Sequence, residues 1–223
     1  MEQKKRKRMY ALVKINLKVA AAVLVSLALC CAAVITVSAV TSEEGVEIPI
    51  VMYHSLLKDE ARHGKYVISP AEFENDLQYL KKHGYTTILM SDLIAYTQGK
   101  ELPEKPVLLT FDDGYYNNYL YAFELAKQYQ CKFVISPIGY YADQYTDTPD
   151  ENAYYSHATW EELQEMAESG LVEVQNHSYN LHKSDGSRLG VKKVSGETET
   201  QYESMLSQDL LTAQEKIEQH VGM

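Results

Sequence analysis

Short runs of apolar residues alternate with longer segments of helical spacing along most of this 223-residue chain. A short continuous apolar run is typical of a strand that is buried on both faces. Because strands and helices alternate repeatedly, the pattern predicts an α/β fold with a parallel sheet, either doubly wound or closed into a barrel. The predicted strands are residues 48–53, 86–89, 107–111, 131–135 and 171–175.

Capping residues mark the ends of several helices between these strands. Ser69 and Pro70 are typical of an N-cap followed by a first-turn proline. Thr159 and Glu162 match a capping box, and Gly170 is the expected stop of that helix. Further helices are predicted at residues 92–98 (with Ser91 as N-cap), 119–129 and 202–220.

The N-terminal region has the pattern of a membrane-targeting segment. Residues 4–8 are all basic, and a long apolar run follows at 19–40. Its length is close to that of a membrane-spanning helix, so we expect a membrane anchor with the body of the protein outside the cytoplasm. Small residues before and at Ala39 also permit cleavage there, which would give a secreted protein. The predicted organisation is a basic segment with signal anchor or signal peptide at 1–40, a linker at 41–47 and a main domain at 48–223.

The charge of the chain excludes some classes of partner. The formal net charge is −10, and because residues 1–40 are rich in basic side chains, the remainder is more acidic still. Such a surface repels nucleic acid, so we expect no nucleic-acid partner. Cys131 is the single cysteine after residue 40, so no disulfide can form within the main domain. The sequence does not indicate an oligomeric state.

A first polar cluster, Thr110-Phe111-Asp112-Asp113-Gly114, follows the third predicted strand. Functional side chains of parallel α/β folds gather at the carboxyl ends of strands. Two adjacent carboxylates leaving a strand point in different directions, so one can bind a metal while the other receives a proton. The same residues can also form a simple helix-entry turn with an aspartate as cap.

A second polar cluster, residues 176–182, follows the fifth predicted strand and contains His177 and His182. Histidines five positions apart point in different directions on a helix, so they can converge only if the segment is a loop. They could instead be two surface histidines of a polar loop. With one carboxylate, two neutral imidazoles make a three-ligand site that leaves a position open for water, which is the catalytic arrangement for zinc.

Other polar and aromatic residues allow two interpretations. Paired tyrosines occur at 115–116, 140–141 and 154–155, and they can pack against sugar rings or serve as half-buried supports. His157 lies in a polar segment before Trp160 and could border the site. We expect His54, which follows the first strand, to be a hydrogen-bonded structural histidine.

Together these motifs resemble carbohydrate esterase family 4, the polysaccharide deacetylases. The resemblance rests on TFDDG at 110–114 and NHSYNLH at 176–182, and the opening IPIVMYHSL at 48–56 is similar to the first strand of many exported members. The five-residue step between the histidines resembles the branch that acts on exported poly-N-acetylglucosamine. The family implies a (β/α) barrel, here incomplete with about five parallel strands and preceded by an N-terminal membrane helix.

The resemblance also implies roles for individual residues. Asp112 would be the general base, while Asp113, His177 and His182 would hold a divalent metal, with zinc expected. The implied activity is metal-dependent hydrolysis of N-acetyl groups from an extracellular polysaccharide, either a cell-wall glycan or one of the poly-N-acetylglucosamine type. The N-acetylated polysaccharide and the membrane are therefore the expected partners.

The family's later motifs supply an acid histidine and an arginine that orients the base, and this sequence contains neither. We therefore expect a domain that is truncated at its C-terminus. Two alternatives stay open. One is a membrane-tethered glycan-binding or vestigial deacetylase that keeps the metal cluster without turnover. The other is an esterase that removes O-acetyl groups from xylan.

Overall fold

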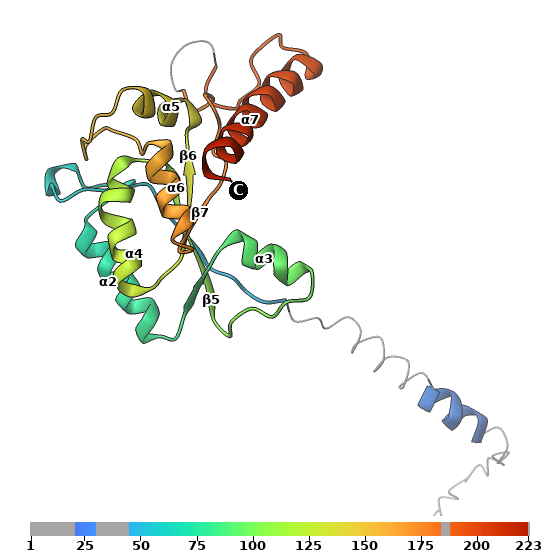
Figure 1. Ribbon diagram of the computed structural model, residues 1–223. Coiled ribbons are helices and arrows are strands. Elements are labelled where there is room, and N and C mark those ends of the chain that lie inside the picture. The colour runs from blue at the N-terminus through green and yellow to red at the C-terminus, as the bar shows by residue number, and fades with distance from the viewer. Residues whose placement is uncertain (1–20, 30–44, 184–187, 223) are drawn as a thin grey trace, which may run out of the picture. The chain divides into compact units, whose positions relative to one another are not determined.

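The computed structural model describes residues 21–29, 45–183 and 188–222, and Glu47–Met223 form one compact unit (Figure 1). The centre of this unit is a five-stranded parallel sheet. Its hydrogen-bonded path runs β1-β5-β6-β7, and β4 also pairs with β5. The strands are β1 (Ile50–Tyr53), β4 (Thr86–Ile88), β5 (Pro106–Asp113), β6 (Phe133–Pro137) and β7 (Val172–Val174).

Strand β5 organises the sheet because it is the longest strand and pairs with three others. Its first residues pair with β4 and its last residues, Thr110 to Asp113, pair with β6. β1 pairs with the middle of β5, from Leu108 to Phe111. A separate two-stranded parallel sheet joins β2 (Ser55–Leu56) to β3 (Val67–Ile68).

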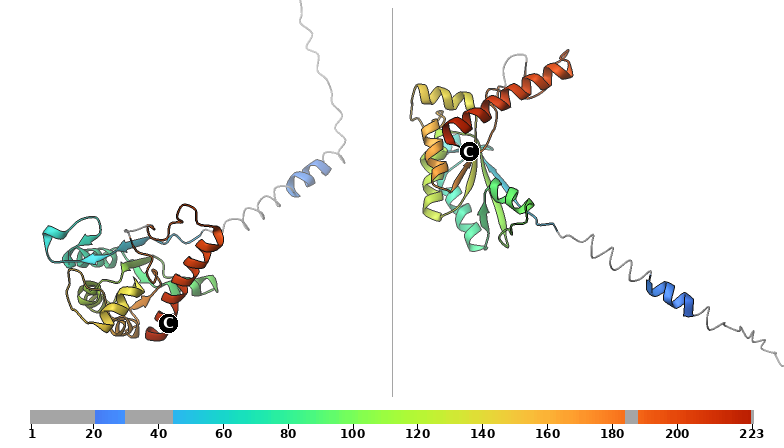
Figure 2. Two further views of the ribbon diagram at one scale, coloured as in Figure 1. Left: turned by 90° about the horizontal axis from the view of Figure 1, so that it is seen from above. Right: turned by 45° about the vertical axis from the view of Figure 1, so that its right-hand side comes forward.

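Helices cover the sheet, most of them on one face (Figure 2). The larger core joins Leu109 and Phe111 of β5 to helices α2, α4 and α6, and a smaller core on the other face joins Leu108 to α3. Alternating positions of the strand thus face different layers, as the two-residue period of a strand requires. The helices are η1 (Glu60–Arg62), α2 (Pro70–Lys82), α3 (Met90–Thr97), η2 (Asn118–Phe123, a π-helix), α4 (Glu124–Tyr129), α5 (Gly139–Asp147), α6 (Trp160–Glu168) and α7 (Glu199–Val221).

The cap predictions are largely confirmed. Ser69 and Thr159 both form complete capping boxes at the starts of α2 and α6. The prediction that Ser91 caps α3 is wrong, because the helix begins at Met90, two residues before its predicted start, and Leu89 is its N-cap. Asp92 provides the polar contact there, since its carboxylate accepts a hydrogen bond from the Leu89 amide at 3.0 Å.

About five parallel strands were expected, and the main sheet has five among the residues that the structure describes, with β2 and β3 forming a sheet of their own. β1 and β7 end the hydrogen-bonded path, and no pairing within the described ranges joins them, so the sheet is not closed into a barrel there. A membrane helix at 19–40 is not supported: residues 21–29 are helical, and no helix among the residues that the structure describes is long and apolar enough to cross a membrane. The rest of that run, apart from 21–29, lies outside the described residues.

Candidate metal centre

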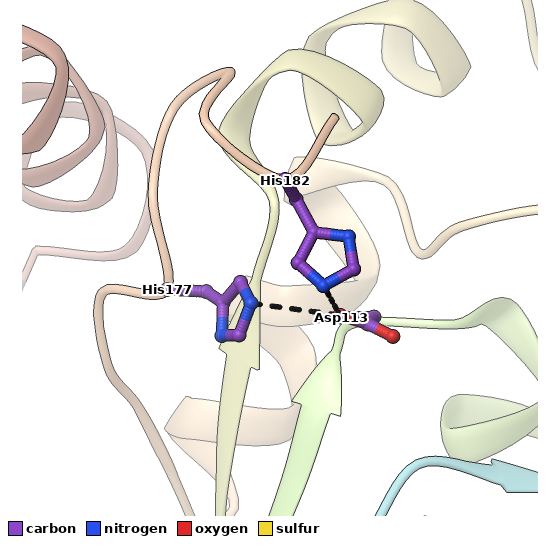
Figure 3. A group of neighbouring side chains, drawn as sticks. All are labelled: Asp113, His177 and His182. Atoms are coloured by element: carbon purple, nitrogen blue, oxygen red, sulfur yellow. Dashed lines mark ion pairs between the residues drawn. The ribbon is translucent and has the colours of Figure 1, made fainter. Parts of the chain in front are cut away.

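Three side chains converge beyond the carboxyl ends of β5 and β7 (Figure 3). Asp113 is the last residue of β5, and His177 and His182 lie in the segment that follows β7. The Nε2 atoms of His177 and His182 lie 3.6 and 3.4 Å from Asp113 Oδ1. Each residue offers one ligand atom, and all three atoms lie within 4.8 Å of one another. The structure therefore brings together the three side chains predicted as metal ligands.

The backbone at the end of β5 turns sharply at the site. Asp113 and Gly114 both have a φ of 71°, in the left-handed region. Such a φ is uncommon outside glycine, although aspartate tolerates it better than most residues. Two contacts fix this turn: the amide of Ile138 donates to the Asp113 carbonyl at 3.3 Å, and His157 Nδ1 lies 2.9 Å from the same oxygen. Strained backbone of this kind often marks a functional site.

The donor atoms fit a divalent cation. Asp113 is 4% exposed, and its buried Oδ1 has no hydrogen-bond partner. A buried acceptor without a partner is costly, and two imidazole nitrogens and one carboxylate oxygen are donors that suit zinc and similar metals. Burial lowers the pKa of His177 and outweighs the opposing effect of Asp113 and Asp112, so the neutral form that can bind a metal is favoured.

Asp112 directly precedes Asp113 in β5, and its side chain lies on the opposite face of that strand. It shares the two-residue alternation of Leu108 and Thr110, whereas Phe111 faces the larger core. The side chain is partly exposed, and its charge acts on His177, which places it near the cluster without being part of it. Its role as general base stays a prediction, as do the ligand roles of the other three residues.

His157 borders the site, as the sequence allowed, and supports it through a contact with the backbone of Asp113. It is 7% exposed, and its ring stacks on those of Tyr115 and Tyr141 at centroid distances of 4.7 and 4.4 Å. Burial lowers its pKa, which favours the neutral ring. It contacts the backbone of Asp113 and belongs to the wall that holds this aspartate in place.

A cleft of about 580 Å³ opens beside the cluster of Asp113, His177 and His182. Asp113 and His182 form part of its wall, so a ligand in the cleft would reach the cluster. Tyr66 and Tyr154, 51% and 54% exposed, also line it, and Arg62 lies 5.9 Å from the Tyr154 ring centroid. Aromatic faces next to charged groups suit a sugar ring, which has both apolar faces and polar edges.

Residues 99–223 match the family described as polysaccharide deacetylase. Among similar proteins is the poly-beta-1,6-N-acetyl-D-glucosamine N-deacetylase of Escherichia coli (strain K12), which is 30% identical in an alignment of 141 residues that covers 59% of this chain and 20% of the relative. The enzyme of the same name from Staphylococcus epidermidis is 25% identical over 134 residues, 60% of this chain and 45% of the relative. The chain thus spans less than half the length of these relatives.

Solved structures share the fold. A de-N-acetylase from Aggregatibacter actinomycetemcomitans has a TM-score of 0.67 and 29% identity, covering 79% of this chain and 76% of that one. IcaB from Ammonifex degensii has a TM-score of 0.63 and 28% identity, covering 80% of this chain and 71% of that one. Both alignments cover most of the compact unit.

Proposed function

This chain belongs to the polysaccharide deacetylase family, whose pattern covers more than half of it, and we propose that it removes N-acetyl groups from a polysaccharide at a metal centre formed by Asp113, His177 and His182. The observation that carries the proposal is the convergence of these three side chains on a buried carboxylate oxygen that has no other partner. The cleft beside them provides room for a sugar unit.

The roles of the residues follow from their positions. Asp113, His177 and His182 would hold a divalent cation, with zinc the expected ion from the donor set. Such a cation polarises an amide carbonyl and lowers the pKa of water, so that hydrolysis can proceed at neutral pH. Asp112 lies next to Asp113 at the end of β5 and would accept the proton of the attacking water. The cleft would orient the N-acetyl group toward both.

The proposed substrate is a β-1,6-linked poly-N-acetylglucosamine. Support comes from the names of the relatives and from the five-residue step between His177 and His182. The charge of the protein agrees with this choice, because removal of acetyl groups leaves a cationic glycan that an acidic surface attracts. Action outside the cytoplasm is part of the same proposal and rests on the basic and apolar pattern at the N-terminus.

The test compares zinc binding with release of acetate. The purified protein, stripped of metal and then reloaded with zinc, is incubated with β-1,6-linked N-acetylglucosamine oligomers, and free acetate is measured. Asp112→Asn should keep zinc but lose activity by about 10²–10⁴-fold, because a general base contributes on that order. His182→Ala should lose zinc as well. The exposed carboxylate of Asp147 provides a matched control, since Asp147→Asn should change neither.

Each outcome separates the possible functions. Equal acetate release by Asp112→Asn and the parent protein would contradict the role of Asp112. Failure of the parent protein to bind zinc would contradict the metal centre itself. Zinc binding without acetate release from any oligomer would favour a glycan-binding protein that keeps the cluster without turnover. Faster release from acetylated xylan than from the oligomers would favour an O-acetyl esterase.

A further inference from the structure

Helix α7 contacts the segment that carries both histidines of the cluster. The amides of Tyr179 and Asn180 donate to the two carboxylate oxygens of Asp209, each at 2.8 Å. At the next residue of α7, the carbonyl of Leu210 accepts a hydrogen bond from Asn176 Nδ2 at 2.7 Å. These contacts bracket His177 and reach the residues that lead to His182. The loop between β7 and the second histidine is thus attached to one side of α7.

From this geometry we propose that Asp209 is a positioning residue: its carboxylate holds two consecutive amides and so sets where His177 and His182 stand relative to Asp113. The effect of Asp209 on metal binding rests on the proposed function, but its hydrogen bonds to the loop do not depend on a metal. Two successive amides held by one carboxylate, one on each oxygen, fix the orientation of two peptide planes. Hydrogen bonds to an ionised acceptor are about twice as strong as neutral ones.

The support behind Asp209 is rigid. Ala213 and Ile217, further along α7, are 1% and 2% exposed, so this part of the helix is packed against the core. Lys216 of α7 forms an ion pair with Asp143 of α5 at 3.0 Å. The ring of His220 stacks on Trp160 of α6, with a centroid distance of 5.1 Å and an interplanar angle of 9°. Because the helix is held in place by these contacts, the Asp209 carboxylate can hold the loop amides at a fixed position.

Helix α5 holds the same loop from another side. The amides of Gly139 and Tyr140 donate to the carbonyls of Ser178 and Tyr179, at 3.0 and 2.8 Å. The Tyr179 hydroxyl donates to Asp143 at 3.0 Å. These bonds use the carbonyls and one side chain of the loop, whereas Asp209 is the acceptor for its amides at 179 and 180. Loss of Asp209 therefore leaves two loop donors without their acceptor, while the bonds to α5 remain. The variant should thus still fold, but its peptide planes at 179 and 180 are no longer fixed from the side of α7.

The closest variant for testing this role is Asp209→Asn. Asparagine has the same shape, but one oxygen is replaced by an amide nitrogen, which is a donor and cannot accept from a backbone amide. One of the two loop amides must therefore lose its partner. Glu203→Gln is the matched control, because Glu203 lies on the same helix, is exposed and loses the same charge.

Three measurements on the full chain test the proposal. Hydrogen exchange of the metal-free parent protein should show protection at the Tyr179 and Asn180 amides, and Asp209→Asn should accelerate exchange there by about 10-fold or more. Competition with a chromophoric chelator should show that Asp209→Asn weakens zinc binding by about 10–100-fold, the usual effect of losing an outer contact of a metal site. The visible absorption of the cobalt-substituted variant should shift, because the ligand geometry changes. Glu203→Gln should match the parent in all three.

Unprotected amides at 179 and 180 in the parent protein would overturn the proposal even if no variant could be purified. It would also be overturned if Asp209→Asn bound zinc as tightly as Glu203→Gln with an unchanged cobalt spectrum. A parent protein that binds no zinc would remove the proposed function. In that case the exchange experiment still decides whether Asp209 holds the loop, so the two failures can be told apart.

Discussion

Replacement of Gly114 by alanine is expected to damage the turn that presents Asp113. The φ of Gly114 is +71°, and an added Cβ would lie 2.6 Å from Cβ and 2.7 Å from Cα of Pro137. Atoms of a neighbouring strand cannot move away as the end of a flexible side chain can. The substitution therefore combines two costs: a left-handed backbone conformation and a collision with β6.

The two costs can be given magnitudes. A left-handed conformation costs a residue with a Cβ about 1–2 kcal/mol. Overpacking of a tightly packed region costs about 1–3 kcal/mol. Gly114→Ala should therefore lower the free energy of unfolding by about 2–5 kcal/mol, a large part of the ~5–15 kcal/mol that ordinary domains possess. Zinc affinity should fall as well, because the turn adjoins Asp113.

Gly170→Ala separates the two costs. Gly170 has nearly the same φ, +72°, but a Cβ there would meet no atom within 4 Å. Gly170→Ala should lower the free energy of unfolding only by the cost of the left-handed backbone, about 1–2 kcal/mol, and should not affect zinc binding. Urea unfolding followed by the fluorescence of Trp160, the one tryptophan and 2% exposed, measures both variants. If Gly114→Ala is no less stable than Gly170→Ala, the collision with Pro137 is not real and the reasoning is refuted.

Two other predictions concern buried polar groups. Asn117→Ala should lower the free energy of unfolding by about 2–4 kcal/mol. This fully buried side chain accepts a hydrogen bond from the Leu56 amide and donates to Ser55 Oγ and the Ala153 carbonyl. Urea unfolding measures the change, and a loss smaller than that of an exposed control such as Gln208→Ala would contradict the prediction. Burial raises the pKa of the Cys131 thiol from 9.0 to about 11, so iodoacetamide at pH 8 should leave this residue unlabelled until urea is added, as peptide mapping would show. The unfolded chain ionises this thiol first, so Cys131 contributes to a fall in stability as the pH rises from 9 toward 11. The fall should be smaller in Cys131→Ala, where tyrosines with raised pKa, such as Tyr53 and Tyr119, still contribute.

Strands β5, β6 and β7 could be predicted because a strand buried between two layers needs a continuous apolar run. The expectation of burial on both faces was wrong for β1, where Ile50 and Met52 are 62% and 58% exposed. The predicted ends were less accurate. β5 continues through Asp112 and Asp113 because backbone pairing with Ser136 and Pro137 on β6 does not require apolar side chains. Helix α5 was not predicted, although Ile138, Tyr141, Ala142 and Tyr145 have the spacing of one helical face. The short strands β2 and β3, of two residues each, leave no pattern.

The cluster of Asp113, His177 and His182 was predictable from positions at strand ends, since parallel strands end at the same edge. The contacts that hold these three side chains in place could not be predicted. His157 contacts the carbonyl oxygen of Asp113, and Asp209 contacts amides of the loop. A contact with backbone atoms places no demand on the residue type of the partner, so nothing in the partner's sequence reveals it. The distance along the chain, 44 and about 30 residues, hides these contacts further.

The adjacent carboxylates Asp112 and Asp113 have different environments because of the alternation of β5 and the turn that ends it. Up to Phe111 the strand alternates between the two cores, so Asp112 falls on the face of Leu108 and stays partly exposed. At Asp113 the chain enters the left-handed region, which ends the strand and buries this carboxylate at 4% exposure. A buried carboxylate without a hydrogen-bond partner is suited to a cation, and a partly exposed one to exchange of a proton with water. Gly114 continues this turn with a φ of 71° and leaves no room for a Cβ beside Pro137, so it keeps the proposed metal ligand Asp113 in its place next to the proposed base Asp112.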